Sequence, residues 1–334
     1  MSHTRLTLLV EDLAALAAAT PGASAPALAR CLARGRPLTR PVANADDLRL
    51  DLFGIRETAP VAALTAAADG LATHGDARYW LRVDPVTLTA DLTRVFMTAR
   101  GLTDIEAADR DPLQACVESV LDDAGYRLLQ GRPGRWLLAL DADPGVRFTR
   151  LEDALGVDLA EVLPDAADAR EWRRLLTDVQ VALHNAEVNV RRRARGVREV
   201  NGVWIWGGGR LPKTRIPAAF ECVVSEHPVS QGLAALAESR ARPGAEQDAA
   251  AAIAEGGRVL LDWAVGRSGA LEELGRLERF FAGLLPDVRR GRLAVTLLDG
   301  GGRGWQLDRA ALRRFWRRAR PLDAAVSGAR EART

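Results

Sequence analysis

One segment restricts the fold more than any other: Glu199-Val-Asn-Gly-Val-Trp-Ile-Trp-Gly-Gly-Gly209. On a strand, Trp204 and Trp206 point to one face and Asn201 to the other. The three glycines that follow permit a positive φ and a close approach of backbones. Two interpretations stay open: a tight turn beside core tryptophans, or a turn whose N–H groups hold an anion. The next residue is Arg210 and no Lys-Ser pair follows, so this is not a Walker loop.

The clearest helix lies just upstream, over residues 170–184. Its apolar residues recur at helical spacing, and Gln180 and His184 share another face because they are four residues apart. A polar run that contains Asn189 and Arg192 then connects this helix to the strand. Its clustered arginines could bind phosphate through forked donors, although a solvated turn is the ordinary alternative for a charged run.

Further along the chain, apolar runs alternate with helical patterns. Residues 6–10, 259–265 and 293–298 are short apolar runs typical of buried strands, and helices are expected between them. Strands that alternate with helices favour a mainly parallel sheet covered on both faces. The fold class predicted is therefore α/β.

Composition limits the kind of protein. The chain has 334 residues, is 48% hydrophobic and has a formal net charge of +2, so no global field favours a polyanionic partner. Cys31, Cys116 and Cys222 form no CxxC pair, which predicts buried free thiols in a reducing compartment. Glu11 and Asp12 interrupt the first apolar stretch, so no secretory signal is expected. With no apolar run of about 18 residues, we expect a cytoplasmic protein without a membrane span.

Catalytic signatures are missing from the sequence. There is no GxSxG, SxxK or HExxH motif. The histidines, His3, His74, His184 and His227, are scattered, and a catalytic dimetal site needs several histidine and carboxylate ligands. We therefore expect no cofactor, with a divalent metal such as Mn or Zn as the alternative.

The C-terminal stretch Arg313-Arg-Phe-Trp-Arg-Arg-Ala-Arg320 interleaves aromatic residues with arginines. This pattern can contact nucleic acid. The near-neutral charge of the chain argues against that partner. The expectation is a basic helix over residues 309–319, with Phe315 and Trp316 packed inward and the arginines outward.

Several of these features together resemble the RpfE-type family of bacterial regulatory proteins. The resemblance covers nearly the whole chain, and its most specific part runs from Leu163-Pro164 through Trp172, Gln180, His184, Asn189, Arg192, Gly196 and Asn201 to residues 204–209. The chain departs from the family pattern at Ala186-Glu187, where the family tends to have His-Pro. It also has Asn201-Gly202 where the family tends to have Asn-Ser.

The chain is similar, more distantly, to the archaeal-type cofactor-independent phosphoglycerate mutases. Where those enzymes have a metal-binding Asp-Gly after the first strand, this sequence has Glu11-Asp12, and where they have Asp-His it has Asp299-Gly300. A glycine cannot ligate a metal through a side chain. The resemblance thus implies an alkaline-phosphatase-like fold in which Glu11, Asp12 and Asp299 are vestigial metal ligands. It also implies these divisions: a core of residues 1–74 and 211–322, an inserted smaller α/β lobe of residues 75–210, and a flexible tail of residues 323–334.

The function implied is that of a catalytically degenerate regulator that binds a small, phosphorylated ligand or a protein partner. The ligand-binding residues expected are Gln180, His184, Asn189, Arg192, Asn201, Trp204, Trp206, Gly207, Gly208 and Gly209. One alternative is an active mutase or phosphatase with an altered metal set of Glu11, Asp12, Asp262 and Asp299. Another is a scaffold or nucleic-acid partner that acts through its C-terminal arginines. The sequence does not indicate the oligomeric state.

Overall fold

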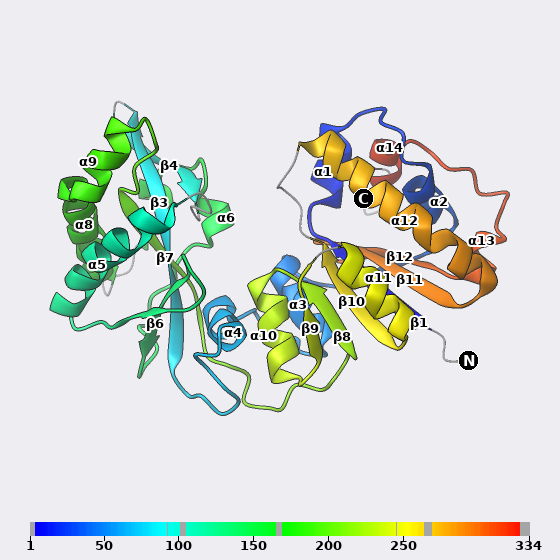
Figure 1. Cartoon of the computed structure of the whole chain (residues 1–334), viewed down its shortest axis with the longest axis horizontal. Helices are drawn as coiled ribbons and strands as arrows, with labels where there is room; N and C mark the ends of the chain where they lie inside the picture. Colours follow the sequence, from blue (N-terminus) through cyan, green and yellow to red (C-terminus); the bar gives the residue numbers. More distant parts are fainter. Residues whose placement is uncertain are drawn as a thin grey trace. The chain divides into compact units, whose positions relative to one another are not determined.

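The computed structural model describes residues 4–91, 93–100, 105–164, 169–244, 246–263 and 269–327 (Figure 1). The chain divides into two compact units. Unit 2 is the continuous stretch Ala59–Lys213, and unit 1 combines the chain up to Thr58 with the chain from Thr214 onward. The first division falls before the predicted residue 74, because the helix α4 (Val61–Ala68) packs on two strands of unit 2.

Unit 1 is built on a seven-stranded sheet. The strand order is β2 (Arg36–Thr39), β12 (Arg303–Leu307), β11 (Leu293–Asp299), β1 (Thr4–Val10), β10 (Arg258–Trp263), β8 (Cys222–Ser225) and β9 (Arg240–Arg242). The five strands from β11 to β9 are parallel, and β12 and β2 continue the sheet in antiparallel fashion. Val10 pairs with both Trp263 and Asp299, so three central strands end at the same level.

Helices cover this sheet, as the alternating pattern predicted. Leu6, Leu8 and Val10 alternate along β1 and point into the main core of the unit. The core is closed by α1 (Leu13–Ala19), α2 (Pro26–Arg34), α12 (Ala270–Arg290) and α14 (Leu322–Ser327). The remaining helices of the unit are α3 (Ala45–Leu52), α10 (Pro228–Leu236), α11 (Glu246–Glu255) and α13 (Arg309–Leu312).

Unit 2 contains a separate antiparallel sheet. Its strands are β3 (Tyr79–Asp91), β4 (Arg94–Arg100), β5 (Leu128–Gln130), β6 (Trp136–Leu140) and β7 (Gly202–Gly209). The long strand β3 pairs with β4, β6 and β7. The helices are α4, α5 (Ala107–Asp123), α6 (Leu151–Ala154), α7 (Leu159–Val162), α8 (Ala169–Asn185) and α9 (Glu187–Ala194). Trp136, Trp172 and Val179 belong to the core that forms between the sheet and the packed pair α5 and α8.

Two expectations for the C-terminal region were wrong. The tail predicted from residue 323 contains most of α14, because Leu322 and Val326 are buried in the core of unit 1; residues 328–334 lie outside the described residues. The helix predicted over 309–319 ends at Leu312, since turns follow and the Arg314 side chain donates to the carbonyl of Arg34 at 3.2 Å.

Within the described ranges, no helix has the length and apolar character required to cross a bilayer.

Candidate functional site

Polar side chains gather at the carboxyl ends of the parallel strands of unit 1. Glu11 follows β1 directly, Ser225 ends β8, Asp262 is the last residue but one of β10, and Asp299 ends β11. In open α/β sheets, ligand sites lie beyond these ends of the strands. This edge is therefore the candidate functional site of unit 1.

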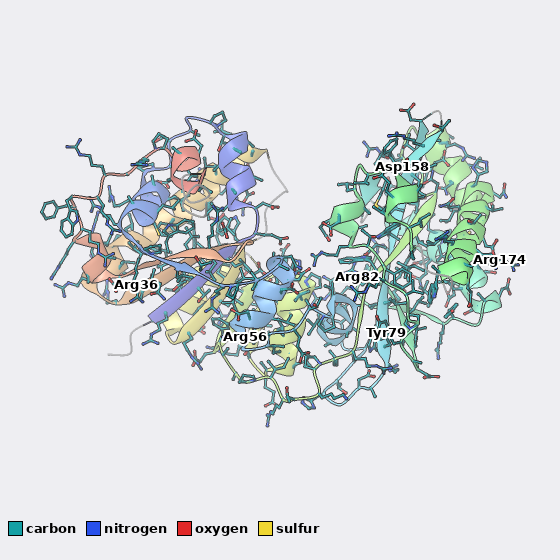
Figure 2. All side chains as sticks on the ribbon, turned by 180° about the vertical axis from the view of Figure 1, so that it is seen from behind. Arg36, Arg56, Tyr79, Arg82, Asp158 and Arg174 are labelled. Carbon is teal, nitrogen blue, oxygen red and sulfur yellow. The ribbon has the colours of Figure 1, made fainter. Side chains whose placement is uncertain are left out.

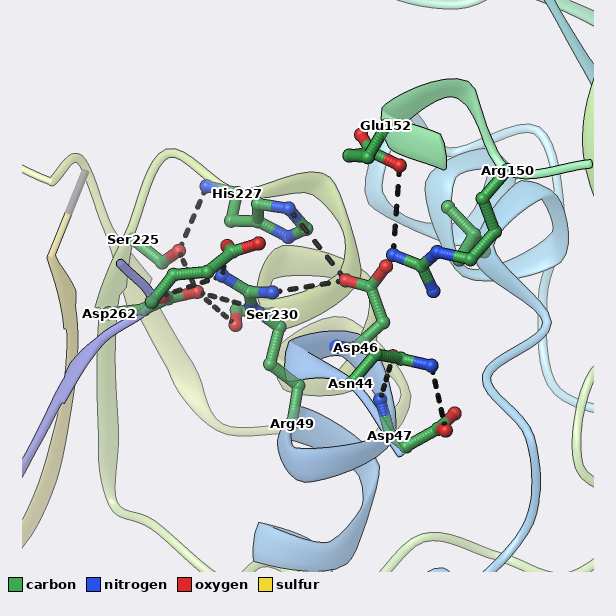
Figure 3. A network of polar contacts seen from close by, with 12 residues as sticks. Asn44, Asp46, Asp47, Arg49, Arg150, Glu152, Ser225, His227, Ser230 and Asp262 are labelled. Carbon is green, nitrogen blue, oxygen red and sulfur yellow. Dashed lines mark hydrogen bonds and ion pairs between the residues drawn. The ribbon is translucent and has the colours of Figure 1, made fainter. Parts of the chain in front are cut away.

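A buried arginine from α3 occupies the centre of this edge (Figure 3). Asn44 caps α3, because its side chain accepts hydrogen bonds from the backbone N–H groups of Asp46 and Asp47, both at 3.0 Å. Asp46 lies three positions before Arg49, so the two side chains lie on one face of the helix. The cap thus fixes the first turn of the helix that delivers both side chains.

Arg49 binds three carboxylates. Its Nε and Nη2 donate to the two oxygens of Asp262 at 2.9 and 3.1 Å, its Nη1 donates to Asp46 at 3.0 Å, and its Nη2 also donates to Glu11 at 2.8 Å. The Arg49 side chain is only 2% exposed. Burial opposes the charge of Arg49, but Asp262, Glu11 and Asp46 outweigh it and raise its pKa above the ordinary value. The guanidinium is therefore a permanent cation at the centre of the site.

Asp262 is the most heavily bonded carboxylate of this cluster. Besides the paired bonds from Arg49, its Oδ2 accepts hydrogen bonds from Ser230 at 2.6 Å and from Ser225 at 3.2 Å. Burial alone would raise its pKa, but the charge of Arg49 and that of His227 when the imidazole is protonated, with the hydrogen bonds from Arg49 and Ser230, lower the pKa of Asp262 to about 2. Asp262 is thus ionised at neutral pH.

His227 borders the cluster from the N-terminal end of α10. Its backbone N–H donates to the Ser225 hydroxyl at 2.9 Å, and its Nε2 lies 3.8 Å from Asp46 Oδ1. Burial of the imidazole, followed by repulsion from Arg49, lowers the pKa of His227 despite the nearby carboxylates. His227 is therefore neutral at neutral pH. Its Nδ1 is buried and has no hydrogen-bond partner among the described residues.

Asp299 is also bonded to an arginine. Arg303 donates to it through Nε at 2.6 Å and through its backbone N–H at 2.8 Å. Glu11 and Asp299, which were predicted to be vestigial metal ligands, therefore both bind guanidinium groups, and Asp12 precedes α1 as its N-cap residue. The chain as described contains no group of three or more His, Cys, Asp or Glu side chains placed to hold a metal ion. The lining of this edge does not fit a divalent metal, because Glu11, Asp46 and Asp262 surround the Arg49 guanidinium, a fixed positive charge that would repel the ion.

The ten predicted ligand-binding residues all lie in unit 2. On α8, Gln180 is partly exposed and His184 is exposed. Asn189 and Arg192 lie on α9, which replaces the polar connection that was expected; both are fully buried. Asn189 donates to the carbonyls of Leu183 and Val200, at 2.8 and 2.7 Å. These bonds hold the helix end against the start of β7.

Arg192 is paired inside the unit. It donates to Asp109 at 2.8 Å and to the carbonyl of Arg198 at 2.8 Å, and Arg195 binds the same carboxylate. Burial would raise the pKa of Asp109, but hydrogen bonds and charge from Arg192 and Arg195 lower it. The guanidinium expected to pair an anionic ligand thus already pairs a carboxylate of the protein.

The tryptophans and Asn201 are bonded to neighbouring segments. Trp204 donates to the carbonyl of Thr149 at 2.9 Å, and Trp206 donates to Asp84. Arg82 also binds Asp84, and its guanidinium lies 5.6 Å from the Trp206 ring centroid. Asn201 exchanges two hydrogen bonds with the backbone of Leu88, at 2.7 and 2.8 Å.

The glycine run is not the turn that was expected. Gly207, Gly208 and Gly209 form the end of β7 beside β3, the strand that carries the labelled Tyr79 and Arg82 in Figure 2. A Cβ on Gly208 would lie 2.5 Å from the Tyr79 hydroxyl, and one on Gly209 would lie 2.5 Å from Cβ of Pro60. Glycine is required at Gly208 and Gly209 for close packing and at Gly207 for a positive φ of 69°, which the sequence predicted. Ligand binding by the ten residues stays a prediction.

Sequence reasoning missed the residues that surround Asp262. Arg49 lies in a stretch whose pattern only predicts a helix, and its partner Asp262 is 213 residues away. A usable signal existed for Ser225, His227 and Ser230, because they follow directly on an apolar strand of a parallel sheet. That position favours a site at the sheet edge.

No protein-family model matches the chain. A probable 2,3-bisphosphoglycerate-independent phosphoglycerate mutase from Geobacter sulfurreducens is 27% identical over 190 residues, which are 56% of this chain and 46% of that protein. The chain thus spans less than half the length of this relative. The match shows distant homology to the cofactor-independent phosphoglycerate mutases.

Two solved structures are similar over most of their length. The PH0037 protein from Pyrococcus horikoshii is matched with a TM-score of 0.58 at 16% identity, over 92% of this chain and 87% of that chain. A cofactor-independent phosphoglycerate mutase from Thermoplasma acidophilum is matched with a TM-score of 0.46 at 14% identity, over 91% of this chain and 89% of that chain. The fold-class prediction is confirmed: the chain has a mixed α/β fold with a mostly parallel sheet and a separate antiparallel sheet, and it shares its fold with the PH0037 protein. By the match to the Geobacter protein, the chain is a distant homologue of phosphoglycerate mutase.

Proposed function

We propose that this chain is a catalytically inactive relative of the phosphoglycerate mutases that acts in regulation, as an RpfE-type protein, by binding a small phosphorylated ligand or a protein partner. One observation carries the proposal: the Arg49 guanidinium lies among Glu11, Asp46 and Asp262 at the carboxyl edge of the sheet. An arginine cannot be deprotonated under ordinary conditions, so these carboxylates keep their cation at any working pH.

The proposal follows from what the fixed cation does to the site. Metal catalysis needs ligands that are free to bind the ion and an open position for water or substrate. The oxygens of Asp262 instead accept hydrogen bonds from Arg49, Ser225 and Ser230. Loss of metal chemistry with retention of the fold is the pattern of a protein that binds rather than converts its ligand.

Metal content and turnover test this proposal on the purified full chain. We expect no stoichiometric Mn or Zn by elemental analysis, and no interconversion of 2- and 3-phosphoglycerate or phosphatase activity when Mn²⁺ is added. Stoichiometric metal together with turnover would contradict the proposal and would favour an active mutase or phosphatase with an altered metal set.

Ligand binding is tested on the same sample. We expect one or more phosphorylated metabolites to raise the melting temperature. His184→Ala is the suitable variant for the predicted ligand residues, because His184 is exposed, whereas Asn189 and Arg192 support the fold of unit 2. A shift that His184→Ala leaves unchanged would exclude His184 from the site. No shift with any metabolite would favour a protein partner.

A further inference from the structure

A cavity of about 310 Å³ in unit 1 is lined almost entirely by positive charge. It lies apart from the Arg49 cluster, and its lining residues are Arg30, Arg34, Arg289, Arg309, Leu312 and Arg313. No carboxylate lines it. The basic cavity, as we name this feature, is thus suited to an anion.

Three helices that pack on one another supply these arginines. Arg30 and Arg34 lie one turn apart on α2, and Arg289 lies in the last turn of α12. Arg309 and Arg313 are the first residue and the C-cap of α13, again about one turn apart. Residues at this spacing share a helix face. All five arginines therefore line one space, in which the Arg34 guanidinium also donates to the carbonyl of Leu312 at 3.0 Å.

These arginines have no acidic partners of their own. In the part of the chain that the structure describes, none of the five lining arginines forms an ion pair. The acid nearest to Arg289 in the sequence, Asp287, binds Arg290 and Arg292, at 3.5 and 2.6 Å. Like charges held close together repel one another, so an external anion would stabilise the cluster. Guanidinium forks match the geometry of phosphate.

An exposed aromatic pair follows the basic cavity in the chain. Phe315 and Trp316 are 76% and 67% exposed, and their rings meet edge to face with centroids 5.4 Å apart. The sequence pattern had predicted that both pack inward. Arg314 fastens this segment to α2 by its hydrogen bond to the Arg34 carbonyl. Two large apolar rings are thus exposed to solvent two and three residues after Arg313, which lines the basic cavity.

We propose that this surface binds single-stranded nucleic acid, with phosphates in the basic cavity and bases stacked on Phe315 and Trp316. Basic grooves that carry aromatic stacking platforms are how proteins bind single strands without sequence preference. The near-neutral net charge of the whole chain does not oppose this, because the charge is local: basic residues outnumber acidic ones in unit 1 only. A membrane surface is less favoured, since such binding uses an amphipathic helix and α13 ends at Leu312.

Fluorescence anisotropy with the full chain tests the proposal. The probes are a labelled 15-nucleotide oligo-dT and an abasic sugar-phosphate oligomer of the same length, each titrated over a range of salt concentrations. We expect both to bind at low salt. The logarithm of the binding constant falls as the logarithm of the salt concentration rises. In the double variant Arg30→Gln/Arg289→Gln, this slope should become shallower by about 1.4, because each phosphate contact on a single strand contributes about 0.7.

The stacking part of the proposal has its own variant. Trp316→Ala should weaken oligo-dT binding at least about fivefold, which is the low end of the loss per stacked base, and leave the abasic oligomer unaffected. Arg240→Gln is the matched control, since Arg240 is exposed in the same unit but paired with Glu255 at 2.7 Å, and it should change neither slope nor affinity.

Three results would overturn the proposal. They are no binding of oligo-dT at low salt, binding that the arginine and tryptophan variants leave unchanged, and binding only to anionic lipid vesicles or only to inorganic phosphate. None of these depends on whether the chain retains mutase activity, so this test and that of the regulatory function fail separately.

Discussion

Unit 1 contains arginines in two contrasting environments, one buried among carboxylates and the other lining the basic cavity. Arg49 is almost fully buried and binds three carboxylates, whereas the five arginines of the basic cavity have none within the described structure. Burial explains the difference, because a charge removed from water needs partners, while a charge that still meets water does not. A buried arginine with internal partners supports the fold, and a surface cluster without them is available to a ligand.

The largest effect expected from this comparison is the loss of Arg49. Arg49→Ala should lower the free energy of unfolding by about 3–5 kcal/mol, since it leaves buried carboxylates without their cation. Urea denaturation of the full chain measures this. Arg30→Ala is the control and should change the same quantity by no more than about 0.5 kcal/mol. Equal effects of the two variants would remove the distinction between buried and surface arginines.

The second effect concerns pH and Asp262. Its pKa in the folded chain is about 2, below the ordinary 3.8, so its ionisation contributes stability that is present above pH 4 and is lost as pH falls toward 2. The size of this contribution is about 2 kcal/mol. Urea denaturation at pH 5 and pH 2.5 should show that Asp262→Asn loses less stability on acidification than the unchanged chain. An identical loss in both proteins would contradict the role assigned to Asp262.

A smaller effect of opposite sign is expected in the basic cavity. Arg289→Gln should raise the free energy of unfolding at low salt, by no more than about 0.5 kcal/mol, because it relieves repulsion among like charges. The gain should disappear at 1 M salt, where charges are screened beyond about 3 Å. Melting temperatures at both salt concentrations measure it. A loss of stability at low salt would contradict the view that repulsion dominates at Arg289, which also lies in the last turn of α12 where the helix dipole favours a cation.

The smallest change in stability is expected at the aromatic pair. Trp316→Ala should alter the free energy of unfolding by less than about 0.5 kcal/mol, because the ring is 67% exposed. Trp305→Ala is the matched control in the same unit: this ring is 7% exposed, and its loss should cost about 3–5 kcal/mol. Chemical denaturation compares the two. A large effect of Trp316→Ala would show that its ring packs against the protein.

The local features of the fold could be predicted from the sequence. The apolar run at residues 6–10 lies within β1, and the helix expected over 170–184 is α8. These predictions hold because the periodicity of a strand or a helix depends on residues that are close together in the sequence. The glycine run at the end of β7 was mistaken for a turn, because the reason for glycine there is the packing of Tyr79 and Pro60, which the local pattern does not contain.

The candidate site was harder to predict. The sequence placed Glu11 and Asp299 at strand ends and named Asp262 only in an alternative metal set, and it did not predict the arginine partners of these acids. Arg49 meets Asp262 only after the sheet has brought distant segments together, and a charged residue in a helix is normally expected to face solvent. The aromatic pair was misplaced for the converse reason: exposed Phe and Trp run against the ordinary preference for burial.

The place of β1 in the sheet has a consequence for how the protein is made. Its two neighbours, β10 and β11, both come from the far end of the chain, and β10 begins at Arg258. A ribosome that adds roughly 5–20 residues per second needs about 12–50 s between the synthesis of β1 and that of its first partner. Unit 2 is continuous and can fold during this interval. The apolar residues of β1 stay exposed to solvent until β10 and β11 are made. We therefore expect the nascent chain to need chaperone protection at its N-terminal segment until β10 has emerged.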